Sequence, residues 1–155
     1  MRKPTLNEWA QLSEIVAAVA VVISLVYVGV GLRANTSAIR SASVQAITNT
    51  SVAGLTAQNS SADLSRIRRI GDVDQSALDE DEQYRYRTLY RQIWLSFQNV
   101  YLQRNLEVVG DELWETYLRI ICAEFQNPGV RATWKDHSSV LNPDFVAAAE
   151  ACPSF

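Results

Sequence analysis

The chain has 155 residues, 48% of them hydrophobic and 20% charged, which is enough for one folded domain and an additional segment. Its formal net charge of -3 argues against a nucleic-acid partner recognised through bulk positive charge. It contains two cysteines and no CxxC pair, which excludes a cysteine-rich secreted scaffold and gives no support to a cysteine-based zinc site.

The first distinctive element is an apolar run, IVAAVAVVISLVYVGVGL, which lies between Glu14 and Arg33 and carries no charge. Its eighteen residues would rise about 27 Å as a helix, close to the hydrocarbon thickness of about 30 Å in a bilayer. The core helix of a soluble protein would show a polar face, and a signal peptide has a shorter apolar stretch followed by a small-residue cleavage site. Neither pattern is present. We therefore predict a transmembrane helix over about residues 12–32, within an N-terminal segment of residues 1–32.

One side of this predicted helix carries small residues at alternating steps of four and three. These residues are Ser13, Ala17, Ala20, Ser24, Tyr27, Gly31, Ala34 and Ala38, and the tyrosine is the only large side chain among them. Small side chains let membrane helices approach closely, and a seven-residue repeat gives a left-handed crossing. The pattern predicts a helix–helix interface through these eight residues. The alternative is a chance stripe, because Ala and Ser are common in membrane helices.

Residues 33–59 are rich in Ala, Ser, Thr and Asn and contain no acidic residue. They could form a weak helix that continues the span, or a flexible juxtamembrane linker, because Ser, Thr and Asn side chains compete for backbone hydrogen bonds. Positive charges do not set the orientation, since Arg2 and Lys3 precede the span and Arg33 and Arg40 follow it.

Residues 60–155 show helix-start and helix-stop signals and no strand-type alternation, so we predict an α-helical domain of four or five helices. The starts lie at Ser60 or Ser61, at Asp79 with Glu82 in a capping box, near Asp111, at Pro128 and at Asn142; Gly71 and Asn105 end the first two helices. The predicted fold class is therefore all-α, with one N-terminal transmembrane helix continuing into a long helix and then a helical bundle.

Apolar residues recur at helical spacing in this domain and are the predicted core. They are Tyr86, Leu89, Ile93, Phe97 and Val100; Leu113, Trp114, Tyr117, Leu118, Ile121 and Phe125; Val130 and Trp134; and Phe145, Val146 and Ala149. The aromatic stripe of Trp94, Phe97, Tyr101, Trp114 and Tyr117 is interpreted as core and not as a cofactor site. The basic cluster of Arg66, Arg68 and Arg69 is interpreted as a solvated or paired face, with Asp79 to Glu82 as a nearby partner.

The sequence contains no recognisable catalytic, cofactor-binding or metal-binding set. His137 is the single histidine and is interpreted as a surface or helix-end residue. Cys122 lies on an apolar helix face and is expected to be buried and inert, although one disulfide between Cys122 and Cys152 is open if the domain lies outside the cytoplasm. No GxSxG, P-loop or GxGxxG motif occurs. We therefore expect a non-enzymatic protein without a cofactor, metal or small-molecule substrate.

Five short motifs follow one another along most of the chain. They are RANTSAIR (Arg33 to Arg40), FQNVY (Phe97 to Tyr101), LWE (Leu113 to Glu115), PGVRATW (Pro128 to Trp134) and NPDF (Asn142 to Phe145). In this order they resemble a family of uncharacterised small bacterial membrane proteins with one span and a C-terminal helical domain. The resemblance implies the bacterial inner (cytoplasmic) membrane and a cytoplasmic helical domain, although this chain has fewer basic residues after the span than such relatives. The family has no assigned activity, so the resemblance implies that these motifs have a structural role and not a catalytic one.

These patterns together predict a single-pass membrane protein that contacts membrane lipid and self-associates through its transmembrane helix. Its helical domain would be presented for protein–protein interaction, as a scaffold or as an accessory subunit of a membrane complex. Ser24 is the only hydroxyl near the middle of the span, so a small homo-oligomeric pore is the alternative, although no ionisable residue lies there. A membrane-tethered enzyme with a site not visible in the sequence is a third hypothesis.

Overall fold

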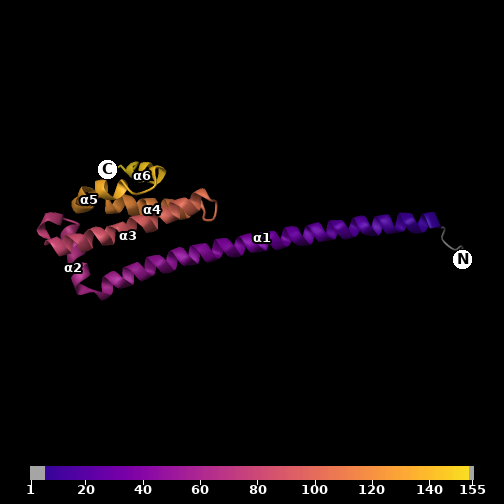
Figure 1. The fold of residues 1–155 in the computed structure, drawn as a ribbon, viewed down its shortest axis with the longest axis horizontal. Helices are drawn as coiled ribbons and strands as arrows, with labels where there is room; N and C mark the ends of the chain where they lie inside the picture. The colour runs from indigo at the N-terminus through magenta and orange to yellow at the C-terminus, as the bar shows by residue number, and fades with distance from the viewer. Residues whose placement is uncertain (1–5, 154–155) are drawn as a thin grey trace. The chain divides into compact units, whose positions relative to one another are not determined.

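The computed structural model describes residues 6–153, and these residues form helices and no strand (Figure 1). The helices are α1 (Leu6–Ser60), α2 (Ala62–Gly71), α3 (Glu80–Asn105), α4 (Asp111–Glu124), α5 (Pro128–Ser138) and α6 (Pro143–Glu150), with a short 3-10 turn, η1 (Gln75–Ala77). The predicted all-α class, with a long N-terminal apolar helix followed by a helical bundle, is confirmed.

Helix α1 is continuous over 55 residues, so residues 33–59 form a helix and not a flexible linker. Their hydroxyl groups bond inside the helix: Thr36 donates to the Leu32 carbonyl and Thr48 to the Val44 carbonyl, each at 2.9 Å. A hydroxyl that is bonded to a carbonyl of its own helix is not free to hydrogen-bond the backbone in a non-helical conformation. The chain divides into two compact units between Ser41 and Ala42, and residues 42–60 of α1 belong to the second unit.

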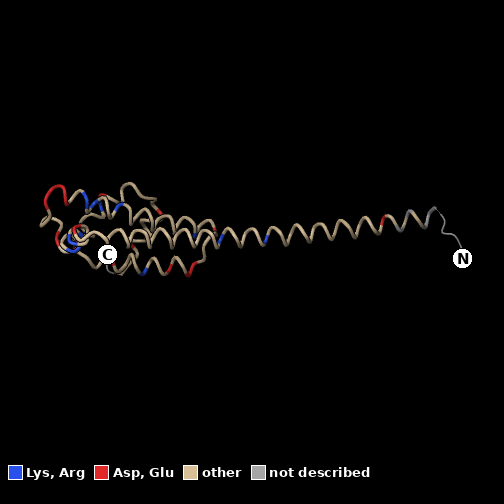
Figure 2. The backbone as a smooth tube through the Cα atoms, turned by 90° about the horizontal axis from the view of Figure 1, so that it is seen from below, with Lys and Arg blue, Asp and Glu red and all other residues tan. Residues whose placement is uncertain are grey.

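The part of α1 in the first unit is apolar and open to its surroundings. Figure 2 shows a long stretch of this helix without acidic or basic residues. By length and composition it could cross a membrane, and its most apolar window is not buried by any described part of the chain. Val22 and Leu25, for example, are 59% and 66% exposed.

The helices of the second unit begin where their capping residues predict. The Ser61 side chain accepts a hydrogen bond from the Leu64 backbone N–H at 3.2 Å at the start of α2. At the start of α3, the Asp79 carboxylate accepts from the Glu82 backbone at 2.8 Å and the Glu82 carboxylate accepts from the Asp79 backbone at 3.2 Å. This is the predicted capping box, which satisfies two N–H groups that the helix itself leaves unpaired.

The last three helices also start as predicted. Helix α4 begins at Asp111, and α5 and α6 each have a proline in the first helical position. The Asn142 side chain caps α6 by accepting hydrogen bonds from the backbone of Asp144 at 3.0 Å and Phe145 at 3.1 Å.

Aromatic side chains fill the centre of the second unit. The Trp94 ring is stacked on Phe125 with centroids 5.3 Å apart and meets Trp134 edge-on at 4.8 Å. The predicted core residues other than Leu89 lie in this cluster or against it, and the aromatic stripe is part of the core, as expected. Leu89 is buried but borders a cavity outside the cluster. Ile93, Tyr101, Leu113, Leu118 and Val146 are only half-buried.

The end of α2 and the start of α5 approach each other so closely that position 129 has no room for a side chain. The Gly129 backbone N–H donates to the Asp72 carbonyl at 2.9 Å. A Cβ atom added at Gly129 would lie 1.7 Å from the Gly71 carbonyl oxygen, which is inside any permitted contact. Further along α5, Val130 is buried and the Trp134 indole donates to the Glu150 carboxylate at 2.8 Å. The PGVRATW motif therefore has a physical basis in this packing.

A disulfide joins Cys122 in α4 to Cys152, which follows α6. The two Cα atoms are 5.4 Å apart, and 30 residues separate the cysteines in the sequence. The expectation that Cys122 is a buried, inert thiol is wrong: Cys122 is half-buried and bonded to the other cysteine of the chain.

We predict that Gly129→Ala lowers the free energy of unfolding of the second unit by at least about 2 kcal/mol, because the methyl group forces apart two backbone segments. Urea unfolding of the purified full chain, followed by circular dichroism, measures this loss. The matched control is Gly54→Ala, which meets no atom within 4 Å in a helix and should be neutral or mildly stabilising. Equal unfolding midpoints for the Gly129 variant and the parent protein would contradict the packing argument.

Candidate functional site

The eight residues predicted as the helix–helix interface all lie exposed on α1. We call them the small-residue face; they are Ser13, Ala17, Ala20, Ser24, Tyr27, Gly31, Ala34 and Ala38. Because their pattern repeats every seven residues and an α-helix has about 3.6 residues per turn, the face drifts by about 20° with each repeat. Tyr27, its one large member, is 80% exposed.

The surface of α1 is slightly hollowed around Ala20 and Ser24, near the middle of this face. Ala20, Val21, Ser24, Leu25 and Val28 line a shallow depression there. The Ser24 hydroxyl donates to the Ala20 carbonyl at 2.9 Å, so its proton is used within its own helix. The depression gives a second helix room to approach closely.

A separate group of polar side chains lies inside the second unit, and we call it the polar cluster: Arg68, Asp72, Tyr86, Tyr90 and Glu124. The Tyr86 and Tyr90 hydroxyls donate to the same Asp72 oxygen, Oδ1, at 3.0 and 2.7 Å. The Tyr90 hydroxyl is also 3.0 Å from Glu124 Oε2, so its single proton is shared between two carboxylates. Arg68 Nη2 donates to Glu124 Oε1 at 2.7 Å, and its Nε lies 3.5 Å from Asp72 Oδ2. The cluster joins α2, α3 and α4.

Burial and charge fix the protonation states of this cluster. Burial would by itself lower the pKa of Arg68, but the neighbouring Tyr90, Glu124 and Asp72 outweigh that effect and hold the pKa above its ordinary value. Burial raises the pKa of both tyrosines, and the carboxylates beside them raise it further. At neutral pH the two hydroxyls are therefore protonated donors, and the arginine stays charged.

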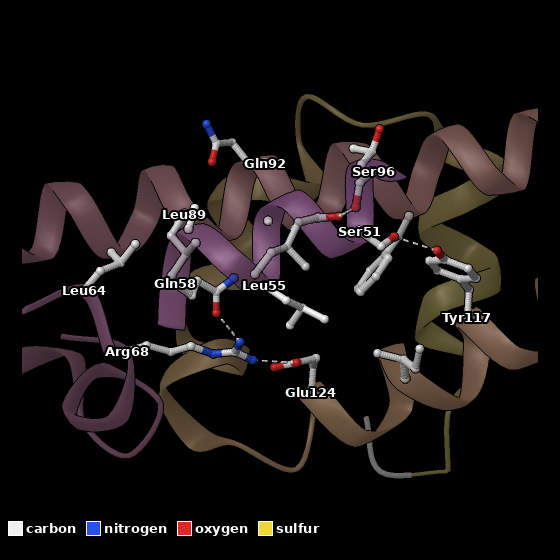
Figure 3. Close-up of a pocket in the computed structure, with 16 residues that line it drawn as sticks. Ser51, Leu55, Gln58, Leu64, Arg68, Leu89, Gln92, Ser96, Tyr117 and Glu124 are labelled. Carbon is white, nitrogen blue, oxygen red and sulfur yellow. Dashed lines mark hydrogen bonds and ion pairs between the residues drawn. The ribbon is translucent and has the colours of Figure 1, made fainter. Parts of the chain in front are cut away.

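A cavity of about 520 Å³ lies beside the polar cluster, between α1, α3 and α4 (Figure 3). Leu55, Leu89, Ile93, Phe97 and Ile120 form much of its apolar wall. A hydrogen bond closes each end, as Figure 3 shows. At one end the Ser51 and Tyr117 hydroxyls are 2.8 Å apart, and at the other Arg68 Nη1 donates to Gln58 Oε1 at 2.6 Å.

His137 is buried, and this corrects the interpretation of it as a surface residue. It lies in the last turn of α5, as a helix-end residue would, but is only 2% exposed. Neither ring nitrogen has a hydrogen-bond partner within the described part of the chain. Burial lowers its pKa, and the nearby Arg91 lowers it further. A buried imidazole without partners is held in its neutral form.

The arginine cluster predicted from the sequence is divided between two roles. Arg66 binds Asp63 and Glu82, so part of the acidic run Asp79 to Glu82 is its partner, as expected. Arg68 instead enters the polar cluster. Among the described residues, no three His, Cys, Asp or Glu side chains are grouped so that they could hold a metal ion.

Sequence reasoning missed the polar cluster and the cavity. Two local signals were present: Arg68 with Asp72, and Tyr86 with Tyr90, are each spaced four residues apart on one helix face. What brings these pairs together with Glu124 is the packing of α2, α3 and α4, which no local spacing encodes.

Comparison of the chain with protein-family models, with curated proteins and with solved structures finds no match.

We predict that the domain loses stability as the pH falls below about 6.5, the ordinary pKa of histidine. The folded state holds His137 neutral, whereas the unfolded chain binds a proton, so the stabilisation is complete above that pH and declines below it by at most about 1.4 kcal/mol per pH unit. Urea unfolding between about pH 7 and pH 5 measures the slope. The variant His137→Leu should show a flatter profile over this range, and an unchanged slope in that variant would contradict the assignment.

Proposed function

We propose that this chain is a single-pass protein of the bacterial inner membrane, which self-associates through the small-residue face and presents its helical domain to a partner protein. It would act as a scaffold or as an accessory subunit of a membrane complex. The observation that carries the proposal is the exposure of the apolar part of α1, where side chains such as Ile23 and Leu32 are 64% and 62% exposed. Exposed apolar area in water costs about 25 cal/mol per Å², so this helix needs lipid or other protein around it.

The shape of the small-residue face supports the self-association. A Cβ atom placed on Gly31 meets no atom within 4 Å, and the depression around Ser24 leaves further room. Van der Waals contact between closely approaching backbones is a main source of association between membrane helices. A small homo-oligomeric pore stays the alternative, and the absence of an ionisable residue near Ser24 in the span counts against it. We also propose, on the ordered motifs, that the chain belongs with the bacterial family that it resembles.

The disulfide bears on the orientation. The resemblance implies a cytoplasmic helical domain, but disulfides persist in oxidising compartments and are rare in the reducing cytoplasm. Both cysteines of this chain are used in one bond within the helical domain. We therefore propose the opposite orientation, with the helical domain outside the cytoplasm and the N-terminus, which carries Arg2 and Lys3, on the cytoplasmic side.

We predict that Gly31→Leu weakens self-association by about tenfold, which corresponds to about 1.4 kcal/mol, because the larger side chain separates the two helices. Energy transfer between donor- and acceptor-labelled copies in lipid vesicles measures the association. Val30→Leu adds apolar volume at the neighbouring position, outside the small-residue face, and should leave the transfer unchanged. Absence of transfer in the parent protein, or equal transfer in both variants, would refute the proposed interface.

We predict that the two cysteines are oxidised in growing bacteria and lie outside the inner membrane. A membrane-impermeant maleimide added to spheroplasts should label the protein only after treatment with a membrane-impermeant reductant. The variant with both Cys122→Ser and Cys152→Ser should remain unlabelled and identifies background reaction. Free thiols in acid-quenched cells, or labelling that requires lysis, would show that the domain lies in the cytoplasm.

A further inference from the structure

The cavity between α1, α3 and α4 exists because α1 does not pack tightly on the rest of the second unit. Among the described residues of α1, Ile47 alone belongs to the buried core. Beyond it, the bonds Ser51–Tyr117 and Gln58–Arg68 connect α1 to the helices opposite. Leu55 lies between these two bonds and is 55% exposed, although it borders the cavity. The space is therefore an apolar hollow below a helix connected to the bundle by polar bonds on either side.

The residues that line the cavity favour a hydrocarbon ligand. The hydroxyls along it are already used within the protein: Thr50 donates to the Ala46 carbonyl at 2.9 Å and Ser96 to the Ile93 carbonyl at 2.8 Å. The rest of the wall is largely aliphatic and aromatic carbon. A ligand that lies along this wall gains by burying apolar surface and finds few polar partners.

The end of the cavity next to the polar cluster favours an uncharged head group. The charged side chains that line this end are Arg68 and Glu124, which pair with each other at 2.7 Å, so their charges sum to zero. Arg68 is also engaged by Asp72 and by Gln58. A carboxylate or phosphate on a ligand would therefore lie beside the Glu124 carboxylate without a free cation to pair with it. The Gln58 amide nitrogen points away from Arg68 (Figure 3), and within the described residues it makes no hydrogen bond, so it can donate to a carbonyl or hydroxyl oxygen.

The cavity is too small to enclose more than about one turn of a peptide helix. A helix with side chains is about 10 Å across, and a cylinder of that width would fill 520 Å³ within about 7 Å, or little more than one turn. A single hydrocarbon chain is much thinner and can extend from the Gln58 end to the Ser51 end. These two residues are seven positions apart on α1, which is about 10 Å along the helix.

We propose that the cavity binds one uncharged single-chain lipid, of the monoacylglycerol type. Its hydrocarbon chain lies between Leu55, Ile93 and Ile120, and an ester or hydroxyl oxygen of its head accepts a hydrogen bond from the Gln58 amide. This assignment goes beyond the proposed scaffold function and does not depend on self-association, since every residue in it belongs to one chain.

The test uses the full chain in phospholipid nanodiscs and a monoacylglycerol that carries a photoreactive diazirine on its hydrocarbon chain. After illumination, mass spectrometry of peptides should locate the label on α3 or α4 residues of the cavity wall, and excess unlabelled monoacylglycerol should remove it. The two proposals are tested by different results of this experiment. Failure of the chain to insert into the nanodisc bilayer would contradict the proposed function. Failure to label the cavity wall would contradict the lipid site alone.

Two leucine variants on neighbouring positions of α1 provide the matched comparison. Gly54 borders the cavity and Ala53 does not, and leucine is a better helix former than glycine, so Gly54→Leu fills the cavity without weakening α1. Cavity labelling should fall by about tenfold or more in Gly54→Leu and stay unchanged in Ala53→Leu. Unchanged labelling in Gly54→Leu, or label confined to residues 15–32 of the apolar helix, would overturn the site. Equal labelling by a diazirine-bearing fatty acid of the same chain length would overturn the inference that the head group is uncharged.

Discussion

Asp72 is the residue on which the arrangement of the helical domain depends. Its carboxylate accepts hydrogen bonds from Tyr86 and Tyr90 of α3, and its backbone oxygen accepts one from Gly129 at the start of α5. Through Arg68 the same network reaches Glu124 of α4. Helix α2 has only ten residues and would not be stable alone in water. These bonds, and the glycine-to-glycine approach beside them, fix α2 against three other helices.

Helix α1 stands outside this network and is connected to it by fewer contacts. Among the described residues, its second part reaches the polar cluster through Gln58, and Ile47 is its one side chain in the packed core, whereas Leu55 borders the hollow. The domain therefore combines a densely packed centre, built on buried hydrogen bonds and stacked aromatic rings, with a less densely packed layer along α1. Ligand sites commonly occur in such places, because tight packing leaves no volume for another molecule.

The sequence predicted the parts of this fold that depend on local chemistry. The capping residues Ser61, Asp79 and Asn142 act within three positions of themselves, so they locate helix starts without knowledge of the tertiary structure. Apolar spacing likewise identified core residues such as Tyr86 and Phe97. By contrast, the Arg68–Glu124 ion pair joins positions 56 apart, and the burial of His137 depends on how α5 packs against its neighbours. Such contacts depend on the arrangement of whole helices, which periodicity does not define.

The position of the disulfide also gives the domain an order of assembly. Cys122 is synthesised 30 residues before Cys152, so the bond between them forms only after the chain beyond α6 has emerged. The two cysteines come within bonding range only when α6, an eight-residue helix, has packed beside α4. The disulfide therefore forms late in folding, after α6 has packed beside α4. A chain truncated before Cys152 would therefore lack the covalent link that ties the segment after α6 to α4.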